Sequence, residues 1–149
     1  MSIPAMAIAI ALQMTPQQWV FAGGDANTGF AVEKSTLRRN GSTVTTWVQA
    51  IPKAPMANMH IGMADYVLSR STYDCDQQTI QRSTIIVYRT DGTVANNATY
   101  PNPEIETPPP GSVGLGILNF LCTPGEVDEY DAFDTPQAMR DAYRAQVGS

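Results

Sequence analysis

The sequence predicts an α+β fold that is mainly β: an antiparallel meander sheet of about five to six strands, a helix tethered to that sheet and a C-terminal helix. Three observations support this prediction. Hydrophobic residues make up 43% of the chain but charged residues only 15%, which suits strands and turns better than a charged helical bundle. Short β-branched stretches are separated by Asn-Gly and Asp-Gly turns. The two helix signals come only after a proline-rich segment near the C-terminal end.

The first half of the sheet is predicted from alternation and from turn residues. Residues 19–22 and 28–33 are the first two strands, and glycines separate them. Asn40-Gly41 predicts a type I′ hairpin turn, which needs positive φ at both of its central residues. The strand at 43–51 then follows, with Val44 and Val48 on one face and Trp47 and Ile51 on the other. We expect the two tryptophans of the chain, Trp19 and Trp47, in the core.

The second half of the sheet begins after a predicted loop at 52–63, which holds two prolines and three methionines. Residues 64–74 and 79–90 form the next pair of strands, and 84–88 is nearly continuous apolar or β-branched sequence, as in a central strand. A second hairpin turn at Asp91-Gly92 leads back into 93–99.

Helices are predicted only in the last third of the chain. Residues 100–110 hold five prolines and are expected to be extended and outside the sheet. Ser112 is a suitable N-cap for a helix at 113–121. Thr135 followed by Pro136 predicts a final helix that runs to about Gln146. The predicted packing faces are Val113, Ile117, Phe120 and Leu121 in the first helix, and Ala138, Met139, Ala142, Tyr143 and Gln146 in the second.

The net charge of -5 comes from one segment. Residues 123–134 hold five acidic residues and no Lys or Arg, so the rest of the chain is neutral. We therefore expect 126–134 to be extended and solvated, and no nucleic-acid partner. The alternative is a Ca²⁺ site formed by Asp128, Glu129, Asp131 and Asp134, but the spacing lacks the glycine and the bidentate Glu of an EF-hand loop.

Two cysteines, Cys75 and Cys122, allow either one disulfide or two buried free thiols. The N-terminal end favours the disulfide, because the apolar run at 3–12 with its Ala9-x-Ala11 arrangement is similar to a secretory leader. The alternative for this run is a short N-terminal helix or tail. It is too short to span a bilayer.

The residues offer little for catalysis. The only histidine, His60, lies among Met56, Met59 and Met63. Thioethers and imidazole suit Cu(I), but an adaptable loop that packs its methionines on the sheet explains the same residues. Ser112 is interpreted as a helix cap, and the pair Asp74 and Asp76 as a strand end. No catalytic, cofactor-binding or metal-ligating residue and no cofactor is therefore assigned.

The order and spacing of several motifs resembles the surface-adhesin protein E family. The resemblance covers about residues 15–122 and rests on Gln18-Trp19-Val20-Phe21, Arg38-Arg39-Asn40-Gly41, the strand around Trp47, Tyr73-Asp74-Cys75, and Pro109-Pro110-Gly111-Ser112. It implies an antiparallel sheet with a helix fastened to it by a Cys75–Cys122 disulfide. It also implies an exported protein, because the founding member is an outer-membrane lipoprotein adhesin that binds host matrix and serum proteins. Unlike that member, this sequence has no lipobox cysteine.

These observations divide the chain into a leader-like or disordered segment at 1–14, a protein E-like β-rich domain at 15–122, and an acidic linker with a helix at 123–149. We expect a non-enzymatic, extracytoplasmic bacterial protein, with no transmembrane span, that binds another protein through its sheet. The alternatives are an envelope accessory subunit that docks through 123–149, or a periplasmic enzyme. The last helix is expected to dock either on its own sheet or on a neighbouring subunit such as a second copy of the chain.

Overall fold

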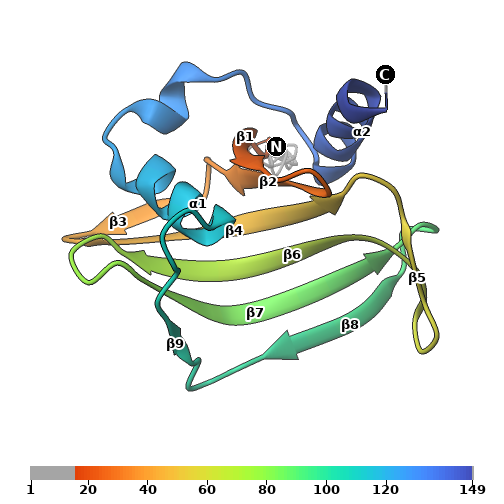
Figure 1. The fold of residues 1–149 in the computed structure, drawn as a ribbon, viewed down its shortest axis with the longest axis horizontal. Helices are drawn as coiled ribbons and strands as arrows, with labels where there is room; N and C mark the ends of the chain where they lie inside the picture. Colours follow the sequence, from red (N-terminus) through yellow and green to blue (C-terminus); the bar gives the residue numbers. More distant parts are fainter. Residues whose placement is uncertain (1–15, 149) are drawn as a thin grey trace, which may run out of the picture.

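The computed structural model describes residues 16–148, in which an antiparallel sheet carries a helix against each face (Figure 1). Six strands follow one another across the sheet in the order β1-β2-β4-β6-β7-β8. The short strands β3, β5 and β9 extend the pairing of β4, β6 and β7. The elements are β1 (Trp19–Gly24), β2 (Thr28–Glu33), β3 (Arg38–Asn40), β4 (Thr43–Pro52), β5 (Met56–Asn58), β6 (Gly62–Asp74), β7 (Thr79–Arg89), β8 (Val94–Thr99), β9 (Ile105–Glu106), α1 (Val113–Cys122), the 3-10 helix η1 (Glu126–Glu129) and α2 (Pro136–Val147).

The meander is confirmed, but the predicted number of strands was too small. The described residues contain nine strands, of which six form the meander. The three additional strands are only two or three residues long, so they carry no alternation that a sequence could reveal. Two of them fall in segments expected to lie outside the sheet: β5, with the start of β6, within the loop predicted at 52–63, and β9 within 100–110.

The turn after β3 differs from the predicted type I′ turn. Asn40 pairs with Thr43, so Gly41 and Ser42 are the central residues of the hairpin. Gly41 alone has positive φ, +59°, and Asn40 remains in the strand. Positive φ at only the first central residue is the pattern of a type II′ turn. The prediction of positive φ at Asn40 was therefore wrong by one register position.

The predicted alternation in β4 is confirmed and separates two hydrophobic clusters. Val44 and Val48 belong to the cluster under α1, whereas Trp47 and Ile51 belong to the cluster on the other face. Trp19 also lies on this second face and is 2% exposed, as expected for a core residue. Trp47 is only half-buried and packs against the edge of the cluster. The core prediction is therefore confirmed for Trp19 and partly for Trp47.

Both helices begin at the residues that the sequence indicates. The Ser112 hydroxyl accepts a hydrogen bond from the Leu115 N–H at 3.2 Å, and the Thr135 hydroxyl accepts one from the Ala138 N–H at 3.0 Å. The buried residues of α1 are Ile117, Leu118, Phe120 and Leu121.

The C-terminal helix α2 docks on its own sheet. It buries Met139 and Tyr143 against the face opposite α1. A buried Asp65 carboxylate also accepts hydrogen bonds from Arg140 at 2.6 Å and Arg144 at 2.5 Å. Of the two expected docking modes, the structure therefore shows the one on its own domain.

The segment 126–134 is only in part the extended, solvated stretch that its charge predicts. Most of its acidic side chains are exposed, but the backbone is not extended throughout. Glu126–Glu129 form η1, and Val127 is buried in the cluster under α1. Asp128 pairs with Lys34 at 2.7 Å. Phe133 exchanges two backbone hydrogen bonds of 2.8 Å with Trp19, at the outer edge of β1. The extended conformation is not adopted throughout because the burial of Val127 and the packing and backbone pairing of Phe133 outweigh the mutual repulsion of the exposed carboxylates.

The leader-like segment predicted at 1–14 lies outside the described residues.

Candidate functional site

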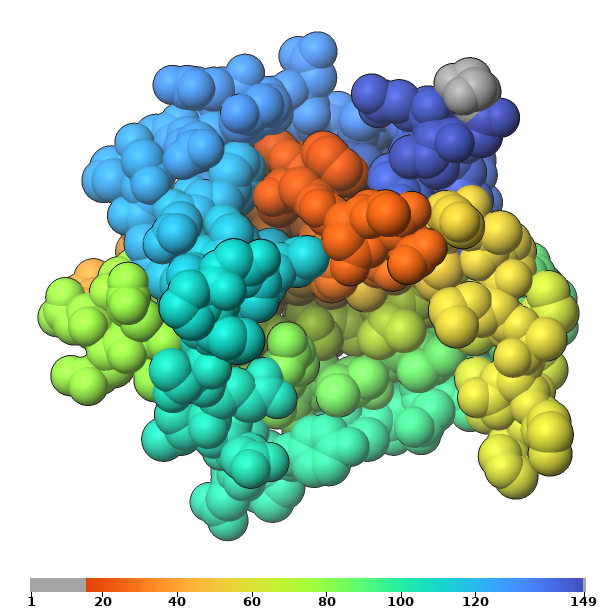
Figure 2. Space-filling model, in the orientation of Figure 1, coloured from red at the N-terminus to blue at the C-terminus, as the bar shows by residue number. Residues whose placement is uncertain are grey.

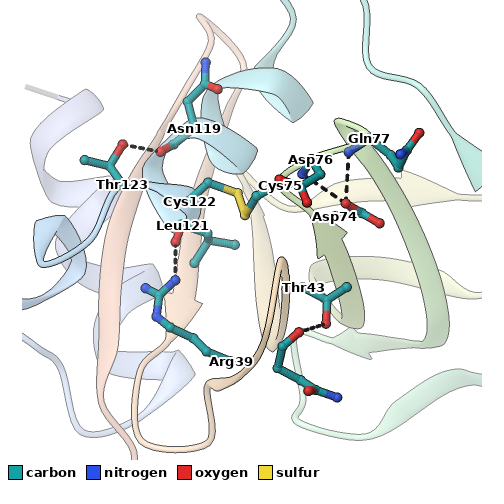
Figure 3. Close-up of a disulfide and its surroundings, with 11 residues drawn as sticks. Arg39, Thr43, Asp74, Cys75, Asp76, Gln77, Asn119, Leu121, Cys122 and Thr123 are labelled. Atoms are coloured by element: carbon teal, nitrogen blue, oxygen red, sulfur yellow. Dashed lines mark hydrogen bonds between the residues drawn. A yellow bond between two sulfur atoms is a disulfide. The ribbon is translucent and has the colours of Figure 1, made fainter.

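Helix α1 is fixed over the sheet at its C-terminal end (Figure 3). Cys75, which directly follows β6, and Cys122, the last residue of α1, form a disulfide with a Cα–Cα distance of 5.7 Å. The Arg39 guanidinium, on β3, donates a hydrogen bond of 2.7 Å to the Leu121 carbonyl. The pairing that the family resemblance implies is thus present, and it holds α1 in place as a wall over the sheet.

A hollow of about 300 Å³ lies beside this wall, over the middle of the sheet (Figure 2). Its floor comes from β4, β6 and β7, and includes Val67 and Ile85, which stay half-buried beside α1. One side is formed by α1 and another by Phe30 of β2. Apolar side chains dominate the lining, which consists of Phe30, Val48, Ala50, Val67, Ser69, Tyr73, Arg82, Ile85, Val113, Gly114 and Ile117.

A second hollow of about 380 Å³ adjoins the first, because Arg82 and Ile85 line both. Its other side is the segment from Tyr100 to Glu106, which lies against the outer side of β7. This hollow is more polar than the first. Arg82 and Glu106 form an ion pair between two partly exposed side chains. We call the two together the α1-face groove.

The groove combines an apolar floor with a few polar and charged side chains. Burial raises the pKa of Tyr73 to about 12, so its hydroxyl stays protonated at neutral pH and does not act as a base. The lining of the groove contains no histidine or cysteine that could act as a nucleophile or general base. It offers a half-buried apolar floor, with Arg82 at the boundary between the two hollows and the carboxylates of Glu104 and Glu106 in the second.

His60 and the surrounding methionines do not converge on a common point. They lie in the exposed β5–β6 hairpin, where Met59 is 96% exposed. Met56 is paired with Ala64, and Met63 with Ala57, so the two thioethers point to opposite faces of the hairpin. The geometry therefore does not support the Cu(I) alternative.

The acidic residues considered for catalysis or for Ca²⁺ binding do not form a site in the structure. The Asp74 carboxylate accepts the backbone N–H groups of Asp76 and Gln77, which closes the turn after β6. Asp128 pairs with Lys34. Within 16–148, no group of three or more His, Cys, Asp or Glu side chains could hold a metal ion, so the Ca²⁺ alternative finds no support there.

A family model described as surface-adhesin protein E matches residues 19–123. The chain belongs to the surface-adhesin protein E family. No curated protein and no solved structure matches it significantly.

The match to the surface-adhesin protein E family covers the sheet, α1 and both cysteines. All residues that line the α1-face groove therefore belong to the family domain of this adhesin-family protein. Helix α2 lies beyond the match, although it packs on the same sheet. None of the helices within 16–148 is long and apolar enough to cross a bilayer.

Sequence reasoning did not identify the groove as a site. The signal was present in β7, where Ile85, Ile86 and Val87 place apolar side chains on both faces of a central strand. Helix α1 covers only part of one face, so Ile85 and Val67 remain half-buried at the surface. Arg82 and the segment 100–106 gave no such signal, because they meet the groove only through the pairing of β9 with β7.

Proposed function

We propose that this chain is a non-enzymatic bacterial surface protein of the adhesin type that binds another protein through the α1-face groove. The observation that carries the proposal is the apolar floor around Val67 and Ile85, which stays half-buried beside α1. Apolar surface removed from water contributes roughly 25 cal/mol per Å² to binding, so side chains of a partner protein gain free energy by filling this floor.

Two further observations support an extracytoplasmic protein that is not an enzyme. The disulfide is of the kind that forms and persists in an oxidising compartment. The family is described as surface adhesins, which are binding proteins. The lining of the groove contains no histidine or cysteine to form the nucleophile–base pair of a Ser/His or Cys/His acyl-transfer site.

The docked position of α2 weighs against the alternative of an accessory subunit that binds through its C-terminal segment. Met139 and Tyr143 form the apolar face of this helix, and both are buried against the sheet. A partner would have to displace them together with the ion pairs between Asp65 and the two arginines of the helix.

The substitution Ile85→Lys tests the proposal, because it places a charge in both hollows. The matched control is Val147→Lys, which adds the same charge on an exposed part of α2. Binding of the purified proteins to immobilised matrix proteins and to envelope extract of the source bacterium is measured by surface plasmon resonance. We expect at least about tenfold weaker binding for I85K and unchanged binding for V147K. Equal binding by I85K and the parent protein, with circular dichroism showing intact folds, would refute the groove as the site.

A further inference from the structure

A further hollow of about 390 Å³ lies where β1, the second half of α1 and the segment around η1 meet. We call it the η1 hollow. It shares no lining residue with the α1-face groove. Glu126 is the one charged residue among those within 16–148 that line it. Three aromatic and three polar side chains form the lining together with small residues: Phe21, Phe120, Tyr130, Asn119, Thr123 and Glu126.

Two of the aromatic side chains are accessible, and all three pack against another ring. Phe21 and Tyr130 are 42% and 50% exposed. The rings of Phe120 and Tyr130 lie 5.8 Å apart between their centroids. Phe21 stacks on Tyr143 of α2, with centroids 6.0 Å apart, so the docked helix supports it. The face of an aromatic ring carries partial negative charge and attracts a cation that lies within about 6 Å of its centroid.

Glu126 adds a full negative charge to the η1 hollow. The residue is half-buried and forms no ion pair with any residue of 16–148. Asp128, in the same short helix η1, is instead paired with Lys34 at 2.7 Å. No Lys or Arg belongs to the described lining, so the charge of Glu126 is not balanced there. The other acidic residues of 123–134 make the surroundings negative as well.

The C-terminal end of α1 also borders the hollow, through Asn119 and Thr123 (Figure 3). The carbonyl dipoles of a helix give this end a partial negative charge, and the last turn of α1 holds no basic side chain. Arg39 binds only the Leu121 carbonyl. The Phe120 carbonyl gains no N–H donor four residues later, because that residue is a proline. The rings, the carboxylate and the helix end therefore all favour a positively charged ligand.

We propose that the η1 hollow binds a small organic cation with a quaternary ammonium group, of the choline type. Such a group carries methyl groups in place of N–H donors, so it binds to ring faces and beside a carboxylate without further hydrogen-bond acceptors. Its charge is opposite to that of Glu126, and its methyl groups remove exposed ring surface of Phe21 and Tyr130 from water. This site is separate from the α1-face groove and from the protein partner proposed there.

Other charged ligands suit the lining less well. The primary ammonium of a lysine side chain is compact and strongly hydrated, so it loses more hydrogen bonds with water when it enters a hollow lined mainly by aromatic and small residues. Ca²⁺ takes about six to eight oxygen ligands, whereas the described lining holds one carboxylate, that of Glu126. An anion would be repelled both by this carboxylate and by the C-terminal end of α1.

An NMR titration of the full chain with choline chloride tests the choice of ligand. Amide signals of residues that line the hollow should shift saturably, with a Kd of about 1 mM, whereas sodium chloride at the same concentration should not shift them. Two further probes are dimethylbutanol, the uncharged carbon analogue of choline, and the methylamide of N-acetyl-lysine. Each should bind at least about tenfold more weakly than choline. The absence of a saturable shift with choline, or equal binding of either probe, would overturn the proposal.

Substitutions in the lining provide an independent test in the same titration. Glu126→Gln and Tyr130→Leu should each weaken choline binding at least about fivefold, because the first removes the charge and the second the ring. The matched controls are Glu129→Gln, which removes a charge of η1 outside the lining, and Tyr130→Phe, which keeps the ring. Both controls should bind choline within about twofold of the parent protein. Equal losses in Glu126→Gln and Glu129→Gln would indicate only a diffuse attraction to the acidic segment and would refute the η1 hollow as the site. Unchanged binding in Tyr130→Leu, with circular dichroism showing an intact fold, would do the same.

Discussion

At Glu33, burial and hydrogen bonding act on one carboxylate in opposite directions. The residue is 2% exposed, and burial by itself would raise its pKa. The carboxylate accepts hydrogen bonds from both the backbone and the hydroxyl of Ser35 and Thr36, and from the Gln18 N–H. Together these donors outweigh burial, so the pKa of Glu33 is lowered from its ordinary value of 4.5. The carboxylate thereby ties the residue before β1 to the turn after β2.

Because the folded pKa of Glu33 is depressed, its contribution to stability is present above pH 4.5 and is lost as the pH falls through the folded pKa. We expect Glu33→Gln to reduce the free energy of unfolding at pH 7 by about 1–3 kcal/mol, since the amide keeps only one acceptor oxygen and the donors at the other oxygen lose theirs. Urea unfolding followed from pH 7 to pH 3 measures this. The difference between the two proteins should shrink as the pH falls, and a constant difference would contradict the assignment to the carboxylate.

At the scale of elements, the docking of α2 depends on a glycine and on one ion cluster. Gly29 lies under the ring of Tyr143, and a Cβ at this position would come within 2.5 Å of the ring. Asp65 accepts hydrogen bonds from Arg140 and Arg144 while its side chain is only 4% exposed. The docking also has a cost, because the buried Tyr143 hydroxyl finds no hydrogen-bond partner among residues 16–148. Apolar packing and the ion cluster together outweigh that cost.

The substitution Gly29→Ala should therefore destabilise the protein by roughly 1–3 kcal/mol, because the sheet and the helix must move apart. Gly116→Ala is the contrasting control. Apart from its chain neighbours and the backbone of its own helix, no atom of residues 16–148 lies within 4 Å of a Cβ there, and the site is in an exposed part of α1. That substitution should stabilise the helix by about 0.5–1 kcal/mol. Thermal and urea unfolding give both values. Two results together would disprove the close contact: G29A is as stable as the parent protein, and Tyr143→Ala changes the free energy of unfolding equally in the parent and in G29A.

Removing the acceptor of the ion cluster should leave two partly buried guanidinium groups without their partner. We expect Asp65→Asn to lower the free energy of unfolding by about 3 kcal/mol, as is typical when one member of a buried ion pair is lost. The control is Asp141→Asn, since Asp141 also pairs with Arg140 but is 71% exposed, so its loss should change stability by less than about 0.5 kcal/mol. Similar effects for the two variants in urea unfolding would argue against a special role of Asp65.

At the scale of the whole molecule, the disulfide joins the end of the central strand β6 to the end of α1, 47 residues later in the sequence. Closing a loop of this length restricts the unfolded chain, and the chain-entropy model gives a stabilisation of about 4 kcal/mol. The cross-link also encloses the whole of β7, β8, β9 and α1. It therefore acts on most of the surface that forms the α1-face groove.

Replacing both Cys75 and Cys122 by Ala should lower the free energy of unfolding by about 2–5 kcal/mol. Differential scanning calorimetry of the double variant, compared with the parent protein under non-reducing conditions, measures the change. The parent protein under reducing conditions is the control and should approach the double variant. An unchanged melting temperature in the double variant would show that packing alone holds α1 on the sheet.

The features that depend on local physical chemistry could be predicted from the sequence. The alternation in β4 assigned Val44 and Trp47 to opposite faces, because side chains of a strand alternate whatever the strand packs against. Ser112 and Thr135 marked the helix starts, since a cap needs only the next turn of backbone. The cysteine spacing by itself allowed free thiols as well as a disulfide, and the disulfide was favoured by the leader-like N-terminal end and implied by the family resemblance.

The way in which distant segments cover the sheet became clear only from the packed chain. Val127 and Phe133 lie in a stretch whose charge predicts solvation, yet contacts with residues far away in the sequence bury Val127 and pair Phe133 with Trp19. The α1-face groove exists because one helix is too short to cover β6 and β7 completely, and the β8 edge is open because no later segment within 16–148 pairs with it. Alternation shows that a strand has two faces, but the segment that covers each face is set by the free energy of the whole packed chain.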